Sequence, residues 1–350
     1  MSIQRNAILN TVALYLLAAS AFAADMPTAL IDGVAYTQAQ RMVEVEPGRR
    51  LNLNCVGTGS PTVVFEAGLG VPISNWGFVQ PVISQKTRAC SYDRAGLGFS
   101  DAGTRASSSK NIVDDLHRLL AAAAIKPPYV LVGHSYGGLT VRLYAYTYPT
   151  DVVGMVLVDP TVEDQSEAYR AVDPKKRTIE QWTADVIEPN LREGRECVAA
   201  APAGFVRGTE LFKKCISNSF VQYSEAVNAS NQRLEMQPAS QQAGLSENEQ
   251  VFGASADQVR AARRSYGDLP LIVLTSSQSP PPKDPLTPEA QTARAASWKV
   301  KVTLRDDVAK LSTRGVNEVV PGAGHYIQLD KPQAVIDAIT RVLAMSKELS

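Results

Sequence analysis

The sequence has few of the residues from which metal sites and nucleic-acid surfaces are built. Only three of its 350 residues are histidine, and its 35 basic side chains are balanced by 35 acidic ones. A chain without excess positive charge gives no sign of nucleic acid or an anionic membrane as a partner. The three histidines are scattered and form no H-E-x-x-H motif, which argues against a catalytic zinc site.

Cofactor-binding motifs are also missing. The chain has no Walker A sequence and no G-x-G-x-x-G after its first predicted strand, and the glycines of AGLGFS, residues 95–100, lack a phosphate-binding spacing. We therefore expect no cofactor. Beyond the N-terminus no apolar run approaches the ~20 residues that a membrane helix needs.

The N-terminal segment has the pattern of a secretory signal peptide. Arg5 precedes a mostly apolar run over residues 7–17, and AFA at residues 21–23 provides an A-x-A cleavage site. The alternative is a membrane anchor, for which the run is short. We expect cleavage after Ala23, export to the periplasm or the medium, and no integral membrane segment afterwards.

Four cysteines, an even number, predict two disulfides in an exported chain. They are Cys55, Cys90, Cys197 and Cys215. Four cysteines allow three pairings, and their order alone selects none of them. Buried free thiols are the alternative.

Short apolar runs alternate with helical segments along most of the chain. We expect strands at residues 41–45, 50–54, 62–68, 88–92, 129–133, 152–158, 269–275 and 316–320. Such alternation predicts a mostly parallel sheet covered by helices on both faces. Residues 161–267 interrupt it with polar, helical sequence. An insertion of this length is typical of a helical cap rather than of one long loop.

The stretch GHSYGG, residues 133–138, matches the G-x-S-x-G motif. It follows a predicted strand and opens a predicted helix, which is the context of a nucleophile elbow. Glycines on either side allow the sharp turn that exposes the serine hydroxyl. We therefore predict Ser135 as the nucleophile; the alternative is a structural turn.

A serine needs a base, and elimination among the three histidines selects one. His134 adjoins the serine, so its side chain is expected to point away from the substrate. His117 lies within a predicted helix. His325 lies in a glycine-rich loop after the last strand, at the sheet end where catalytic residues collect. We predict His325 as the base.

The oxyanion of an acyl-transfer reaction needs two N–H donors. The residue after the nucleophile, Tyr136, provides one amide. The other is expected from the glycine-flanked loop after the third strand, at the amide of Leu69.

The order of these motifs resembles the α/β-hydrolase superfamily, and most of all its esterase and lipase-like members with a helical cap. The resemblance spans residues 41–349 and rests on EAGLG (66–70), SYDRAGLGFSD (91–101), GHSYGG (133–138), VLVDP (156–160) and GHYIQLD (324–330). It implies an α/β fold with a mostly parallel eight-stranded sheet, helices on both faces, and a cap inserted after the sixth strand. The expected segments are a signal peptide (1–23), core (24–160), cap (161–267) and core (268–350).

The resemblance also implies a disulfide pairing. In the sheet of that superfamily the second strand lies beside the fourth. This order implies that Cys55 lies near Cys90, and it leaves Cys197 and Cys215 together in the cap. One departure concerns the oxyanion loop, where many members have His-Gly and this chain has Ala67-Gly68. The backbone donor survives that change.

The acid of the catalytic triad has two candidates. In the family it usually follows the seventh strand, where Asp284 lies nine residues beyond Thr275 and behind three prolines. Asp159 directly closes the sixth strand, a position that some members use. Sequence reasoning leaves both open.

We thus expect an exported serine hydrolase that cleaves a small-molecule carboxylic ester through an acyl-enzyme. Alternatives are an amidase, lactonase or acyl transferase with the same triad, or a non-catalytic binding protein of this fold. Serine at the elbow argues against the dehalogenases and epoxide hydrolases of the fold, which use aspartate there.

Overall fold

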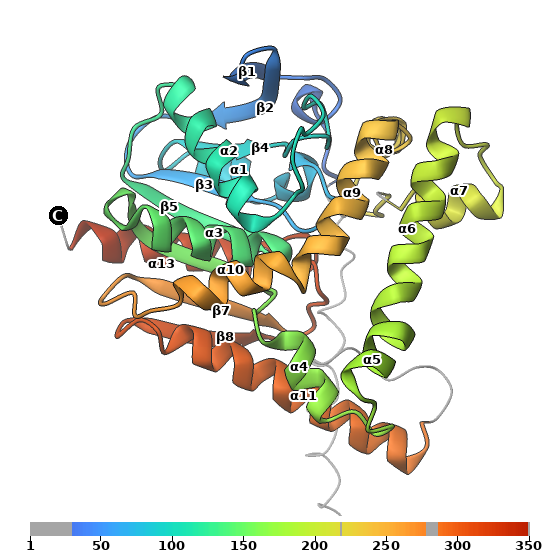
Figure 1. The fold of residues 1–350 in the computed structure, drawn as a ribbon. Helices are drawn as coiled ribbons and strands as arrows, with labels where there is room; N and C mark the ends of the chain where they lie inside the picture. Colours follow the sequence, from blue (N-terminus) through green and yellow to red (C-terminus); the bar gives the residue numbers. More distant parts are fainter. Residues whose placement is uncertain (1–29, 218, 278–285, 349–350) are drawn as a thin grey trace, which may run out of the picture. The chain divides into compact units, whose positions relative to one another are not determined.

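The computed structural model describes residues 30–217, 219–277 and 286–348 (Figure 1). The predicted signal segment, residues 1–23, and the candidate acid Asp284 lie outside the described residues.

One eight-stranded sheet, in the order β1-β2-β4-β3-β5-β6-β7-β8, forms the centre of the fold. The strands are β1 Arg41–Glu46, β2 Arg49–Val56, β3 Thr62–Glu66, β4 Ala89–Tyr92, β5 Tyr129–His134, β6 Val152–Val158, β7 Leu271–Ser276 and β8 Gly315–Val320. Strand β2 runs antiparallel to both β1 and β4, and the other pairs are parallel. The predicted fold class is therefore confirmed.

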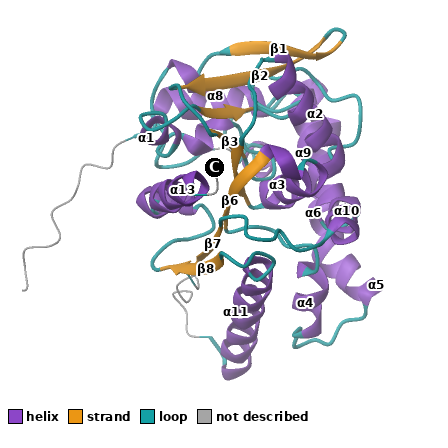
Figure 2. Cartoon of the chain, turned by 90° about the vertical axis from the view of Figure 1, so that its left-hand side faces the viewer, coloured by secondary structure: helices purple, strands orange, loops and turns teal. Residues whose placement is uncertain are grey.

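Helices cover both faces of the sheet, because its central strands are apolar on both sides. Every residue of β3, β5 and β7 is buried. The helices are α1 Gln80–Ile83, α2 Ser109–Ala122, α3 Tyr136–Thr147, α4 Gln165–Ala171, α5 Ile179–Trp182, α6 Glu188–Ala200, α7 Glu210–Cys215, α8 Glu225–Glu235, α9 Pro238–Val251, α10 Ala254–Ala262, α11 Pro288–Ala309, α12 Ile327–Asp330 and α13 Pro332–Lys347. Residues of α2, α3, α10 and α11 pack into one core cluster, and those of α1 and α13 into a second. Figure 2 shows α2 and α3 on one side of the sheet and α13 on the other.

The segment between β6 and β7 contains helices α4 to α10, as the pattern of residues 161–267 predicts. A π-helical turn, Thr183–Ile187, joins α5 to α6, and α6 packs along α9. Helix α10 packs against α2 and α3. The inserted segment thus ends in the helix layer that covers the sheet.

Two disulfides are present, with the pairing that the resemblance implies. Cys55 of β2 lies directly opposite Cys90 of β4 in the sheet register, and their sulfurs are bonded. Cys197 of α6 is bonded to Cys215 of α7.

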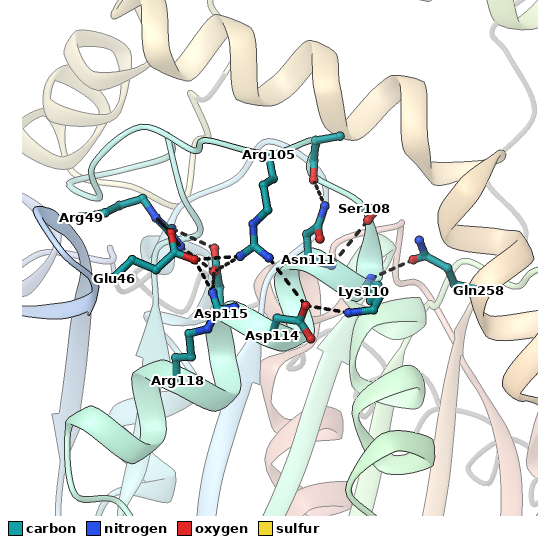
Figure 3. Close-up of polar contacts among 11 residues, drawn as sticks. Glu46, Arg49, Arg105, Ser108, Lys110, Asn111, Asp114, Asp115, Arg118 and Gln258 are labelled. Atoms are coloured by element: carbon teal, nitrogen blue, oxygen red, sulfur yellow. Dashed lines mark hydrogen bonds and ion pairs between the residues drawn. The ribbon is translucent and has the colours of Figure 1, made fainter.

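An ion-pair network joins helix α2 to the β1–β2 hairpin (Figure 3). Arg49 donates two hydrogen bonds to Asp115 of α2, at 2.9 and 2.7 Å, and another to Glu46. Arg105 and Arg118 also contact Asp115. Because Arg49 is only 5% exposed, its charge depends on these carboxylates.

Among the described residues, no helix combines the length and apolar character needed to cross a bilayer.

Candidate active site

Ser135 occupies a sharp turn between β5 and α3. Its backbone has φ 51° and ψ −118°, a conformation that L-residues rarely adopt. The glycines of the motif allow close packing there. A Cβ at Gly133 would lie 2.5 Å from the carbonyl oxygen of Gly137, and one at Gly137 would lie 2.5 Å from that of Glu66. Any larger residue at either position would push the turn away from the sheet.

The loop after β8 brings His325 to the serine. The Nε2 atom of His325 lies 2.9 Å from Ser135 Oγ, and its Nδ1 atom lies 2.6 Å from Oδ2 of Asp159. The His325 side chain is 47% exposed, so part of the ring is open to solvent beside Ser135. The three side chains form one continuous hydrogen-bonded line.

Asp159 follows β6 directly, also in the left-handed region at φ 41°. Its Oδ1 atom accepts the N–H of Ser276 at 2.9 Å, which fixes the carboxylate. Burial alone would raise the pKa of Asp159. The hydrogen bond with His325 and the charges of Arg305 and Lys301 outweigh burial and hold that pKa well below its usual range. Asp159 is therefore a negatively charged carboxylate at neutral pH.

Helix α11 supplies both cations, and the sequence analysis predicts no helix there. Lys301 Nζ lies 3.1 Å from Oδ1 of Asp159, and Arg305 Nη2 lies 3.4 Å from the same atom. A start signal was available: Thr287 caps the helix by accepting the N–H of Ala290, and Pro288 occupies its first position. Nothing local to the helix indicates that it faces Asp159.

His134 points into the protein, as expected, and contacts the backbone of His325. Its Nε2 atom lies 3.0 Å from the backbone oxygen of His325, and the side chain is buried. Burial lowers the pKa of His134 to about 3, so the ring is neutral. A neutral ring whose Nε2 faces a carbonyl carries its proton on Nε2 and donates it. His134 thereby anchors the loop that carries His325.

His117 lies away from this site. It stacks on Tyr148 with ring centroids 4.0 Å apart, as a packing residue of α2.

The two predicted oxyanion donors, Leu69 and Tyr136, line one cavity together with Ser135 and His325. A Cβ at Gly68 would lie 3.3 Å from Cβ of Ser135, so the loop after β3 passes directly beside the elbow. Tyr136 is the first residue of α3, and its N–H has no partner within the helix. Within residues 30–217, 219–277 and 286–348, no hydrogen bond uses the Leu69 N–H.

The cavity has a volume of about 370 Å³ and continues toward the inserted helices. A second cavity, of about 500 Å³, reaches the disulfide between Cys197 and Cys215. Leu69 and Asn248 line both cavities, so the two cavities adjoin at these residues. Across the described part of the chain, His, Cys, Asp and Glu side chains form no cluster that could hold a metal ion.

Comparison with known proteins identifies the family of this chain. The model of the alpha/beta hydrolase family matches residues 63–338, well over half of the chain. The chain belongs to the alpha/beta hydrolase family.

Several curated proteins are similar to parts of this chain or to most of it. It is 39% identical over 108 residues to uncharacterized protein YqjL of Bacillus subtilis, covering 31% of this chain and 43% of that protein. It is 24% identical over 302 residues to 2-(acetamidomethylene)succinate hydrolase of Mesorhizobium japonicum, covering 84% and 92%. Alignments to the first curated relatives span less than half of each relative's length.

A solved structure of a putative lipase from Acinetobacter baumannii AYE superimposes with a TM-score of 0.62 at 19% identity, covering 90% of this chain and 94% of that one. At this identity the likeness establishes the alpha/beta hydrolase fold.

Proposed function

We propose that this hydrolase is an exported serine hydrolase that cleaves carboxylic esters through an acyl-enzyme intermediate. The observation that carries the proposal is the line from Ser135 Oγ to His325 Nε2, at 2.9 Å, and from His325 Nδ1 to Asp159, at 2.6 Å. A hydroxyl, a base and an orienting acid at hydrogen-bond distance are the parts that activate a serine nucleophile.

The proposed reaction assigns the chemical steps to named residues. Ser135 attacks the ester carbonyl while His325 takes its proton, and Asp159 stabilises the resulting imidazolium. The amides of Leu69 and Tyr136 receive the negative oxygen of the tetrahedral intermediate. His325 then protonates the leaving alcohol. Water, deprotonated by His325, finally releases the acid and restores Ser135.

Asp159 serves as the acid in this proposal because it already contacts His325. Its position after the sixth strand matches the second of the two sequence candidates. Asp284, the other candidate, lies outside the described residues.

Cavities of about 370 and 500 Å³ are of the size that a small-molecule substrate fills. The similar Mesorhizobium protein is a hydrolase of a small succinate derivative, which supports the same size class here. The two disulfides and the signal-like N-terminal sequence support export, because disulfides persist in oxidising compartments.

A fluorophosphonate probe tests the proposed nucleophile. The wild-type chain is expected to be labelled at one serine and to hydrolyse p-nitrophenyl esters. Ser135→Ala is expected to lose both activities, because no other hydroxyl has His325 at hydrogen-bond distance in the described structure. Labelling is measured by intact-protein mass spectrometry, and hydrolysis by p-nitrophenolate release across acyl chain lengths.

Absence of labelling and hydrolysis in the wild type, or equal labelling of Ser135→Ala, would reject the serine-hydrolase proposal. Ser277→Ala is the matched control. Ser277 follows β7 and its hydroxyl donates to the carbonyl of Ala323, so this variant should be labelled like the wild type.

A further inference from the structure

Arg94, buried behind the oxyanion loop, uses every donor of its guanidinium. It follows β4 and is 4% exposed. Its Nη2 atom donates to the carbonyl of Gly68 at 2.6 Å, and its Nη1 atom donates to that of Ala67 at 2.7 Å. The remaining three bonds go to carboxylates, one to Glu66 at 2.7 Å and two to Glu247 at 2.6 and 2.9 Å. Five N–H groups thus have five acceptors.

The bond to Gly68 determines where the next amide points. In a trans peptide, the carbonyl of one residue and the N–H of the next point in opposite directions. Arg94 holds the carbonyl of Gly68, so the N–H of Leu69 is turned away from Arg94. Leu69 and Ser135 line the same cavity, and Arg94 is not among the residues that line it.

Glu247 of helix α9 holds the other end of the same short loop. Its Oε2 atom accepts the N–H of Gly70 at 2.7 Å while also accepting from Arg94. Leu69 therefore lies between two residues that are held in place. Arg94 holds the carbonyl of Gly68, and Glu247 holds the N–H of Gly70. Glu247 comes from the inserted helices, and the next residue, Asn248, lines the substrate cavity.

The charge of Arg94 also affects the strength of the Leu69 donor. A cation bonded to the carbonyl of a peptide draws electron density from it and makes the N–H of that peptide more acidic. The second predicted oxyanion peptide is held differently. The carbonyl of Ser135 accepts two neutral donors, the N–H groups of Gly138 and Thr161, each at 2.9 Å.

We propose that Arg94 and Glu247 are positioning residues that orient the Leu69 amide toward the oxyanion and, through the charge of Arg94, strengthen it as a donor. The inference rests on the proposed function, since it requires an oxyanion at Ser135. It also makes the inserted helices part of the catalytic geometry, because Glu247 contributes to the loop from α9.

The test compares Arg94→Gln with Arg49→Gln. Both changes remove a buried arginine from a carboxylate partner, but Arg49 contacts Asp115 and Glu46 rather than the oxyanion loop (Figure 3). Steady-state hydrolysis of p-nitrophenyl acetate gives kcat and KM. Inhibition by phenylboronic acid, which forms a tetrahedral adduct on serine, reports affinity for a transition-state mimic.

For Arg94→Gln we expect kcat to fall by about 10- to 100-fold with KM within about threefold, since a misaligned donor acts on the transition state. The inhibition constant for phenylboronic acid should rise by about 10-fold. For Arg49→Gln, both quantities should remain within about threefold of wild type.

Glu247→Gln gives a second measurement that does not depend on Arg94→Gln folding. Glutamine keeps an oxygen for Gly70 but places an amide group against Arg94. We expect about 10-fold lower kcat with little change in KM.

Three results overturn the inference. The first is an equal loss of kcat in Arg94→Gln and Arg49→Gln. The second is a change in Arg94→Gln that affects KM and leaves kcat unchanged. The third is an unchanged affinity for phenylboronic acid in both Arg94→Gln and Glu247→Gln. If the wild type neither hydrolyses the ester nor reacts with fluorophosphonate, the proposed function fails and this inference fails with it.

Discussion

The carboxylate of Asp159 contacts three nitrogen-bearing side chains. His325 Nδ1 lies 2.6 Å from it, and Lys301 and Arg305 lie at 3.1 and 3.4 Å. Burial lowers the pKa of Lys301, but the charge of Asp159 opposes that shift. Each cation reduces the field with which Asp159 stabilises a protonated His325. Lys301 and Arg305 therefore reduce the negative charge that His325 faces.

Removing one of these cations should move the pH profile of the enzyme. In Lys301→Gln, one of the two cations that oppose the charge of Asp159 is gone, so the acid side of the activity profile should move to higher pH. The acid side of the kcat/KM profile measures the shift.

Asp159→Asn leaves both cations without a counter-charge, and we expect kcat to fall on the order of 10³- to 10⁴-fold.

A Lys301→Gln profile that coincides with the wild type would show that Lys301 acts only in packing. Lys299→Gln, in the same helix but without a contact to Asp159 in the described structure, is the matched control.

At the scale of elements, the disulfide between α6 and α7 closes a short loop beside the second cavity. Its cysteines are 18 residues apart, and those that join β2 to β4 are 35 apart. Cross-linking lowers the entropy of the unfolded chain, and the effect grows slowly with loop length. Both disulfides should stabilise the fold to a similar extent.

Replacing each pair by alanine tests this expectation. The Cys197→Ala/Cys215→Ala variant should lose about 3 kcal/mol of unfolding free energy, and the Cys55→Ala/Cys90→Ala variant about 4 kcal/mol. Urea unfolding monitored by circular dichroism measures both. A loss below about 1 kcal/mol in either variant would mean that the chain-entropy account fails there.

At the scale of the whole molecule, His134 links folding to pH. Burial lowers its folded-state pKa from an ordinary 6.5 to about 3. The unfolded chain therefore binds a proton in a pH range where the folded chain does not. The stabilisation from a neutral His134 is complete above pH 6.5 and is lost as the pH falls toward 3.

His134→Gln should remove this part of the acid sensitivity. Between pH 7 and pH 5 the wild type should lose about 2 kcal/mol more unfolding free energy than the variant, because glutamine takes up no proton. Urea titrations at both pH values measure the difference. Equal losses in the two proteins would mean that His134 is not the group responsible.

Local sequence patterns were sufficient to predict the strands, the inserted helices and the turn at Ser135. The alternation of apolar runs and helical segments predicted the sheet and the inserted helices, since each strand carries its own period and flanking turns. The glycines around Ser135 indicated the elbow, because the turn cannot form with larger residues. A count of three histidines was enough to select His325, which lies beside Ser135.

Only the tertiary structure brought together the groups that adjust this site. His325 meets Asp159 across 166 residues, Arg94 meets Glu247 across 153, and Lys301 reaches Asp159 across 142. The sequence left Asp159 and Asp284 both open as partners of His325, and nothing local to Arg94, Glu247 or Lys301 indicates what each of them contacts. Their contacts depend on strand order and on how the inserted helices pack, and those follow from burial of the whole core rather than from any local pattern.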